Sequence, residues 1–170
     1  MLTGWIVRFD ARADAALGHM RGNPLADGLA TAASALGDHG LLWLLIAIVR
    51  GRNPRRRAIA ARAVAITGII APTVNMSLKV AVNRHRPPRI ATSPSLVRVP
   101  RTSSFPSGHA LAAWCAATLL ADDDPGWPLY YAAALAVAWS RVHLRLHHTS
   151  DVVAGSLLGA AIGRLARRIA

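Results

Sequence analysis

The stretch from Ser140 to Asp151 reads SRVHLRLHHTSD, and the rest of the chain is best interpreted around it. His147 and Asp151 are four residues apart, a spacing that places two side chains on one face of a helix. A carboxylate there can accept the proton of one imidazole nitrogen and leave the other nitrogen basic. Arg141 and Arg145 lie just upstream, and guanidinium groups bind phosphate through paired hydrogen bonds. The stretch therefore predicts an oriented histidine nucleophile beside fixed cations, which suggests phosphoryl transfer.

The composition favours a small membrane protein. Of the 170 residues, 53% are hydrophobic and 16% are charged, and 20 Lys and Arg against 8 Asp and Glu give a net charge of +12. The cations alternate with long apolar runs and do not form one basic face, so loops that meet anionic lipid headgroups are favoured over a nucleic-acid surface. We expect one domain over residues 1–170, partnered by the lipid bilayer and by no nucleic acid. The oligomeric state stays open.

Six apolar stretches predict an all-α fold, a polytopic helical membrane bundle. Residues 1–21 combine helical apolar spacing with charges at mid-length, which predicts an amphipathic helix at the membrane interface, although a soluble surface helix has the same pattern. Residues 23–170 would form the bundle, with the active site within 79–151. Residues 23–50 meet a polar break at GDHG, residues 37–40, where two glycines favour a broken helix pair over one helix. Asp38 and His39 in this break could line a site, although a solvated joint is favoured.

Residues 58–83 are the best candidate for a membrane span, with a kink at Pro72. Residues 84–104 are rich in Pro, Arg and Ser and are expected to form a long loop. Arg84 and His85 could touch substrate there, although a solvated position is favoured. Further helices are expected over 106–121, 127–146 and 148–169, with a hydrated turn at the acidic run 122–124. Their apolar cores are shorter than the ~20 residues of a full span, so the number of spanning helices stays open.

Three polar clusters lie at helix ends that a simple up-and-down threading places on one side of the membrane. They are Lys79 with Arg86, the PSGH segment 106–109, and Arg141 with His147 and Asp151. A transferred phosphoryl group spreads negative charge over its oxygens and needs several fixed donors. The residues expected to bind phosphate are cations, a hydroxyl and a backbone amide at a helix N-terminus: Lys79, Arg86, Arg141, Ser107 and Gly108.

The catalytic residues predicted from these clusters are His147, His109 and Asp151. His147, oriented by Asp151, would attack phosphorus and form a phosphohistidine, and His109 would protonate the leaving oxygen. Water would then release phosphate, with His109 as the base. We expect neither a metal ion nor another cofactor, because arginine and lysine neutralise the charge.

In order and spacing, the three clusters resemble the signature of the type 2 phosphatidic acid phosphatase superfamily. The matching segments are Lys79-x6-Arg86-Pro87, Pro106-Ser107-Gly108-His109 and Ser140-Arg141-x5-His147-x3-Asp151. The resemblance implies an all-helical fold, metal-independent lipid phosphatase activity and the residue roles given above. This chain departs from the family in length, because an interfacial helix stands in the place of a first span. Polyprenyl pyrophosphate, a polyprenyl-linked sugar phosphate and phosphatidate are all possible substrates.

Alternatives remain for the site and for the activity. His143, His147 and Asp151 form a stripe that could bind zinc, although the arginine, lysine and PSGH clusters favour phosphate. His148 is also close to Asp151, and the signature selects His147.

Two alternative functions remain: a non-catalytic membrane protein that binds anionic lipid headgroups, and a lipid phosphotransferase. On this threading eight cations, from Lys79 to Arg145, lie on the side of the site, and nine lie on the opposite side. Because substrate would occupy the eight, we expect the nine to mark the cytoplasm of a plasma-membrane protein whose active site is extracytoplasmic.

Overall fold

The computed structural model describes residues 4–88, 101–122 and 124–169, apart from the side chain of His39. Over these ranges the regular structure is entirely helical, as the sequence predicted. The helices are α1 (Gly4–Gly18), α2 (Pro24–Gly37), the 3-10 turn η1 (Asp38–Gly40), α3 (Leu41–Gly51), α4 (Pro54–Ala65), the π-helical turn η2 (Ile66–Ile70), α5 (Ala71–Val82), α6 (Gly108–Leu120), α7 (Trp127–His143) and α8 (Thr149–Arg168).

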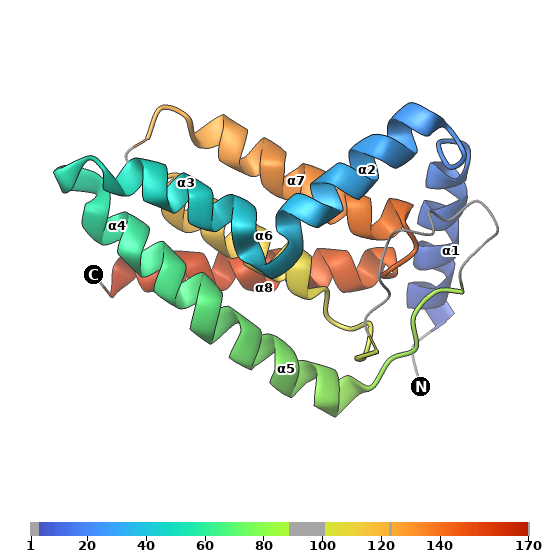
Figure 1. Ribbon diagram of the computed structural model, residues 1–170. Helices are drawn as coiled ribbons and strands as arrows, with labels where there is room; N and C mark the ends of the chain where they lie inside the picture. Colours follow the sequence, from blue (N-terminus) through green and yellow to red (C-terminus); the bar gives the residue numbers. More distant parts are fainter. Residues whose placement is uncertain (1–3, 89–100, 123, 170) are drawn as a thin grey trace.

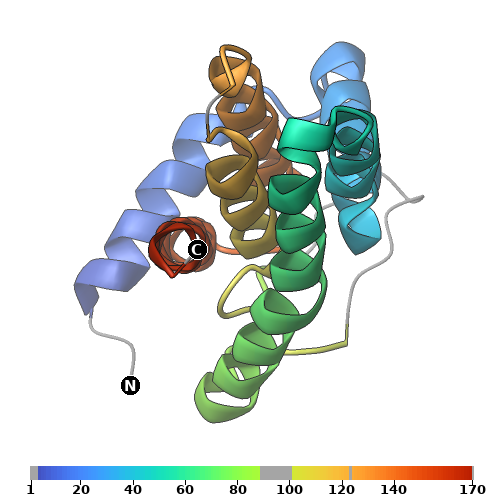
Figure 2. The same cartoon turned by 90° about the vertical axis from the view of Figure 1, so that its left-hand side faces the viewer.

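Helix α6 lies at the centre of the bundle, with α8 on one side and α3, α4 and α7 on the others (Figures 1 and 2). Its contact with α8 is the most extensive in the fold. Three glycines of α8, Gly155, Gly159 and Gly163, face α6 at intervals of four residues. A Cβ atom at Gly159 would lie 2.2 Å from the carbonyl oxygen of Leu111, so only glycine permits this approach.

Helices α4, η2 and α5 run on as one helix of 29 residues, Pro54–Val82, which is long and apolar enough to cross a membrane. The helix predicted over 58–83 is therefore present and begins slightly earlier than expected. Its π-helical turn ends just before Pro72, which has no N–H and whose ring would clash with the carbonyl of an undistorted preceding turn. The irregularity expected at Pro72 thus takes the form of a local widening of the helix.

The predicted break at residues 37–40 is confirmed. Helices α2 and α3 meet at 62°, and Gly40 adopts a left-handed conformation with φ of 69°, which favours glycine. Within the described ranges there is one helix able to span a membrane, or two if this bent pair forms a single span.

Helix α1 packs on α7 and α8 at the end of the bundle where α5 also ends (Figure 1). Trp5, Val7 and Phe9 on its outer surface are exposed, whereas Asp10 is buried. Arg8 and Arg12 are exposed on the same helix. Exposed aromatic and basic side chains together suit a helix that lies at a membrane interface, and that placement stays a prediction.

The turn between α6 and α7 lies at the opposite end of the bundle and is not simply hydrated. The side chain of Asp124 is nearly buried, and its Oδ2 lies 3.2 Å from Arg50 Nε and 3.0 Å from Arg56 Nη1. Tyr130 donates a hydrogen bond of 2.9 Å to the same oxygen. These contacts tie α3 and α4 to the start of α7.

Candidate active site

The candidate site lies where several chain ends meet: the segment after α5, the residues before α6, and the loop from α7 to α8 (Figure 1). Backbone hydrogen bonds join these segments. The amide of Ser104 donates to the carbonyl of Arg84 at 2.8 Å, and the amide of Ser107 donates to the carbonyl of Asp151 at 3.0 Å. The structure therefore brings residues of all three signature segments to one end of the molecule.

His147 lies in the loop between α7 and α8, and its side chain is buried. The expectation that it shares a helical face with Asp151 is wrong, because α8 begins only at Thr149. The two side chains are nevertheless close, with His147 Nδ1 at 3.8 Å from Asp151 Oδ2. Nδ1 is only 2.6 Å from the carbonyl oxygen of Ser104, which is therefore its hydrogen-bond partner.

The pKa of His147 is lowered from its ordinary value of 6.5 to about 3, chiefly by burial. The nearby carboxylate of Asp151 acts in the opposite direction, and the cations Arg86 and Arg141 act in the same direction as burial. The imidazole is therefore neutral at neutral pH, which is the state that a nucleophile requires.

Arg86 is held over the outer nitrogen of His147. Its Nη1 atom lies 3.2 Å from His147 Nε2 and also donates to the carbonyl of Leu146. Its Nε and Nη2 atoms donate to the carbonyls of Thr102 and Ser103, at 3.1 and 3.3 Å. A guanidinium fixed in this way lies where an anion attacked by Nε2 would have to bind.

Lys79 and Arg141 complete a group of three cations around this point. Lys79 is buried in the last turn of α5 and donates to the Ser103 carbonyl, and Arg141 is buried in the last turn of α7. Lys79 experiences the charges of Arg86 and Arg141, and Arg141 experiences that of Arg86. The buried Nε of Arg141 has no hydrogen-bond partner within the described part of the chain. Because like charges repel, such a group is stabilised by a bound anion.

Ser107 and Gly108 form the start of α6. Ser107 is the N-cap residue, and its Oγ accepts a hydrogen bond from the amide of Ala110 at 3.5 Å. A Cβ atom at Gly108 would lie 2.9 Å from Asn75 Nδ2 on α5, so glycine allows α5 to approach this helix N-terminus closely. The expected binding of phosphate by Ser107 and Gly108 stays a prediction.

His109 contacts the carboxylate of Asp38, which was expected in a solvated joint between two helices. Its Nε2 atom lies 2.6 Å from Asp38 Oδ1, in the break between α2 and α3. Arg141 also experiences the charge of Asp38. Asp38 is therefore in contact with His109 and close enough to Arg141 for its charge to act there. The polar break in an apolar stretch was the available signal, but nothing local indicated which segment it faces.

Arg84 was expected in solvent and is instead buried. Its Nη1 atom donates to Asp151 Oδ1 at 2.5 Å, and its Nη2 atom donates to Asp10 Oδ2 of α1 at 2.7 Å. Neither Asp10 nor Arg84 was among the predicted site residues. Arg84 lies inside the first signature segment and Asp10 lies on a predicted amphipathic helix, and neither position indicated this contact.

The zinc alternative receives no geometric support. His143 ends α7, and its Nε2 atom lies 2.7 Å from Asp27 of α2, so it does not continue a helical stripe to His147. Among the residues that the structure describes, no group of three or more His, Cys, Asp or Glu side chains is placed to hold a metal ion.

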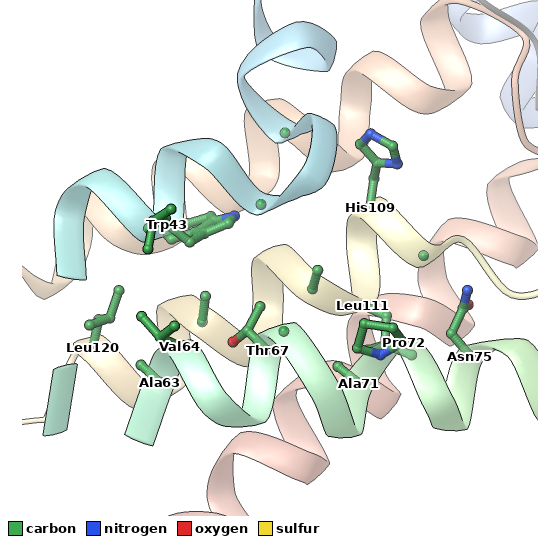
Figure 3. A pocket seen from close by; sticks show the side chains of 17 residues that line it. Trp43, Ala63, Val64, Thr67, Ala71, Pro72, Asn75, His109, Leu111 and Leu120 are labelled. Atoms are coloured by element: carbon green, nitrogen blue, oxygen red, sulfur yellow. The ribbon is translucent and has the colours of Figure 1, made fainter. Parts of the chain in front are cut away.

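The two predicted catalytic histidines line different cavities. His109, Gly108 and Asn75 form one end of an apolar cavity of about 440 Å³ between α3, the long helix and α6 (Figure 3). His147 lines a second cavity of about 810 Å³, which α1 closes on one side. A single space shared by both imidazoles stays a prediction.

The chain is similar to proteins of known activity. A family model described as the PAP2 superfamily matches residues 58–170. The decaprenylphosphoryl-5-phosphoribose phosphatase of Mycobacterium tuberculosis is 38% identical over 137 residues, which are 78% of this chain and 73% of that protein. The undecaprenyl-diphosphatase of Sulfolobus acidocaldarius is 40% identical over 72 residues, which are 41% of this chain and 35% of that protein.

Two crystal structures share the fold. A transmembrane PAP2-type phosphatidylglycerolphosphate phosphatase from Bacillus subtilis superposes with a TM-score of 0.81 at 25% identity, covering 99% of this chain and 87% of that chain. LpxE from Aquifex aeolicus superposes with a TM-score of 0.74 at 21% identity, covering 93% and 94%, a likeness of fold alone.

Proposed function

Because the chain belongs to the PAP2 superfamily and is therefore a phosphatase, we propose that it hydrolyses a phosphomonoester or pyrophosphate of a membrane lipid through a phosphohistidine. The transmembrane neighbour and the long apolar helix indicate an integral membrane protein. The observation that carries the lipid part of the proposal is the apolar cavity that begins at His109.

The cavity is lined mainly by apolar side chains, as a site for part of a lipid tail would be. His109 and Asn75 lie at one end and Leu120 at the other, with apolar side chains such as Trp43 between them (Figure 3). The helix from Ala63 to Asn75 that lines it is about 18 Å long at 1.5 Å per residue. That is roughly half of a ~30 Å hydrocarbon core, so a tail in this cavity would leave the phosphate near the end of the bundle.

The residues of the site have the chemistry for hydrolysis in two steps. Nε2 of His147 attacks phosphorus while the bond to the leaving oxygen breaks, and His109 donates a proton to that oxygen. Lys79, Arg86 and Arg141 stabilise the charge on the three remaining oxygens. Water then attacks the phosphohistidine, His109 accepts its proton, and the phosphorus–nitrogen bond breaks to release phosphate and His147.

Asp38 and Ser104 support the two histidines in this scheme. The Ser104 carbonyl holds the proton of His147 on Nδ1, and the Asp38 carboxylate stabilises a positively charged His109. Arg86 is closest to His147 Nε2, so substrate phosphate would bind between these two groups and replace their mutual contact.

Among possible substrates, lipids with a polyprenyl chain are the first to test, because the names of two relatives contain such a lipid. Phosphatidate-type lipids remain candidates, as does transfer of the phosphoryl group to an acceptor other than water. We place the protein in the plasma membrane with the active site on the extracytoplasmic side, because the opposite end carries the basic segment 50–62.

The test is phosphate release by the purified protein from a panel of lipid phosphates and from the soluble ester p-nitrophenyl phosphate. The panel contains undecaprenyl diphosphate, decaprenylphosphoryl-5-phosphoribose and phosphatidylglycerol phosphate. We expect release from at least one lipid. If the wild type releases no phosphate from any substrate and His147→Asn still binds anions, the lipid-binding alternative is favoured.

A variant in the cavity separates recognition of the tail from chemistry. Gly68 lines the cavity, and a Cβ atom there meets nothing within 4 Å, so Gly68→Leu would extend a side chain without a backbone clash. We expect a greater loss of activity on the long-chain lipid than on the soluble ester. The matched control is Gly28→Leu in α2, where a Cβ atom also meets nothing within 4 Å. Equal losses on both substrates would show that the cavity does not hold the tail.

A further inference from the structure

Asp10 is a buried carboxylate in α1, a helix on which Trp5 and Phe9 are exposed. Both of its oxygens are used: Oδ1 accepts from the amide of Ser150 at 2.8 Å, and Oδ2 accepts from Ser150 Oγ at 2.8 Å and from Arg84 Nη2 at 2.7 Å. A buried charge is costly unless it is paired and hydrogen-bonded, and these contacts satisfy Asp10 fully. They attach α1 to the first turn of α8.

Arg84 connects Asp10 to the signature residue Asp151. Its Nη2 atom binds Asp10, and its Nη1 atom binds Asp151 Oδ1 at 2.5 Å and Ser150 Oγ at 2.7 Å. Both carboxylates and the guanidinium are buried. A planar guanidinium anchored at two nitrogens has one orientation, so Arg84 cannot turn away from Asp151 without breaking its contact with Asp10.

The position of Asp151 matters for His147. Its Oδ2 atom accepts a hydrogen bond of 2.9 Å from the backbone amide of His148 and lies 3.8 Å from His147 Nδ1. Arg84 thus holds one oxygen of Asp151 while the other faces the predicted nucleophile and the loop that carries it. The cavity that His147 lines is also closed on one side by α1.

We infer that Asp10 and Arg84 are positioning residues for catalysis: Asp10 of α1 fixes Arg84, which fixes Asp151 beside His147. Helix α1 is then part of the active site, in addition to any role at the membrane surface. This inference rests on the proposed function, since it assigns a role to groups that act on the predicted nucleophile.

The first test is Asp10→Asn, which removes the charge and keeps the shape of the side chain. We expect kcat to fall about ten- to a hundredfold, the effect of losing one hydrogen bond between charged groups, with little change in KM. The control is Asp122→Asn, in the turn between α6 and α7 at the opposite end of the bundle. Asp122 pairs with Arg167 of α8, far from Asp10 and Asp151, so this variant should retain its kcat.

A double-mutant cycle tests whether Asp10 acts through Arg84. If it does, Asp10→Asn combined with Arg84→Gln should be no slower than Arg84→Gln alone. Multiplicative losses would overturn the inference, as would an Asp10→Asn enzyme with wild-type kcat. If Asp10→Asn does not fold, Arg84→Lys is the second variant. An ammonium keeps the charge but cannot bridge both carboxylates in the same way. An Arg84→Lys enzyme with wild-type kcat would also contradict the inference.

The wild-type enzyme separates this inference from the proposed function. If wild type releases no phosphate from the lipid panel or from p-nitrophenyl phosphate, the proposed function fails. If wild type is active and Asp10→Asn is equally active, only the positioning role fails. Thermal unfolding of each variant in detergent identifies any loss of kcat that reflects a smaller folded fraction.

Discussion

The Nδ1 atom of His147 lies 2.6 Å from the carbonyl oxygen of Ser104. A carbonyl only accepts hydrogen bonds, so Nδ1 carries the proton and Nε2 bears the lone pair. Nε2 lies 3.2 Å from Arg86 Nη1, a donor. Both neighbours therefore select the same tautomer, which is the one that can attack an anion held by Arg86.

His147→Asn should abolish turnover. The asparagine amide can still donate toward the Ser104 carbonyl, but it has no nucleophilic nitrogen, so we expect a loss of at least about 10³-fold in kcat. Phosphate release measures turnover, and phosphate binding to the variant shows whether the cation cluster is intact. His148→Asn is the neighbouring control, because asparagine is a favourable N-cap residue for α8. Equal losses in both variants would contradict the assignment of His147.

The lowered pKa of His147 predicts a specific dependence on pH. A nucleophile whose pKa lies below 6.5 stays neutral as the pH falls through that value, so kcat/KM should retain its His147-dependent activity well below pH 6.5. Stability should behave in the opposite way. Below pH 6.5 the unfolded chain binds a proton at His147 that the folded chain does not, so acid lowers the free energy of unfolding.

Thermal unfolding in detergent between neutral and mildly acidic pH measures this effect on stability. The wild type should lose more stability on acidification than His147→Asn, which cannot take up that proton. Identical pH dependence in the two proteins would show that His147 is not buried in its neutral form.

Vanadate should inhibit the enzyme, and a chelator should not. Vanadate adopts the five-coordinate geometry of the transferred phosphoryl group, and the cations Lys79, Arg86 and Arg141 can bind its oxygens. The measurement is phosphate release with each additive. Inhibition by a chelator that zinc reverses would instead support a metal site.

The helices and their order could be predicted from the sequence because apolar periodicity and glycine breaks are local signals. The spacing of His147 and Asp151 correctly predicted two neighbouring side chains, but for an incorrect reason. His147 precedes α8, and Asp151 is the third residue of that helix, where it reaches back to the amide of His148. An acidic residue at that position of a helix is a capping signal that the sequence already contained.

The residues that were missed could not have been found in this way. Asp38 was interpreted as part of a solvated joint and Arg84 as part of a solvated loop, and Asp10 lies on a helix with other charges. Each side chain belongs to the site only because distant segments pack beside it: α2 and α3 beside α6, and α1 beside α8. Such contacts depend on the tertiary arrangement, about which a local pattern gives no information.

Gly159→Ala should destabilise the protein. Its Cβ atom would lie 2.2 Å from the carbonyl oxygen of Leu111 and 2.9 Å from the carbonyl carbon, so α6 and α8 must move apart at a cost of about 1–3 kcal/mol. The control is Gly28→Ala inside α2, where a Cβ atom meets nothing within 4 Å and the gain in helix propensity predicts equal or higher stability. Thermal unfolding of both variants in the same detergent measures the difference. Equal stability of the two variants would contradict the close packing of α6 on α8.

Labelling of one introduced cysteine tests the orientation in the membrane. Ser95 lies outside the residues that the structure describes, in the sequence between α5 and α6; the end of α5 and the start of α6 both lie at the candidate site. Cys115 is the only cysteine of the chain and is fully buried, so wild type is a background control for a membrane-impermeant thiol reagent. We expect Ser95→Cys to be labelled from outside intact cells, because the nine cations at the other end mark the cytoplasm. Labelling only after the cells are opened would reverse the orientation, and the substrate would then have to be presented on the cytoplasmic leaflet.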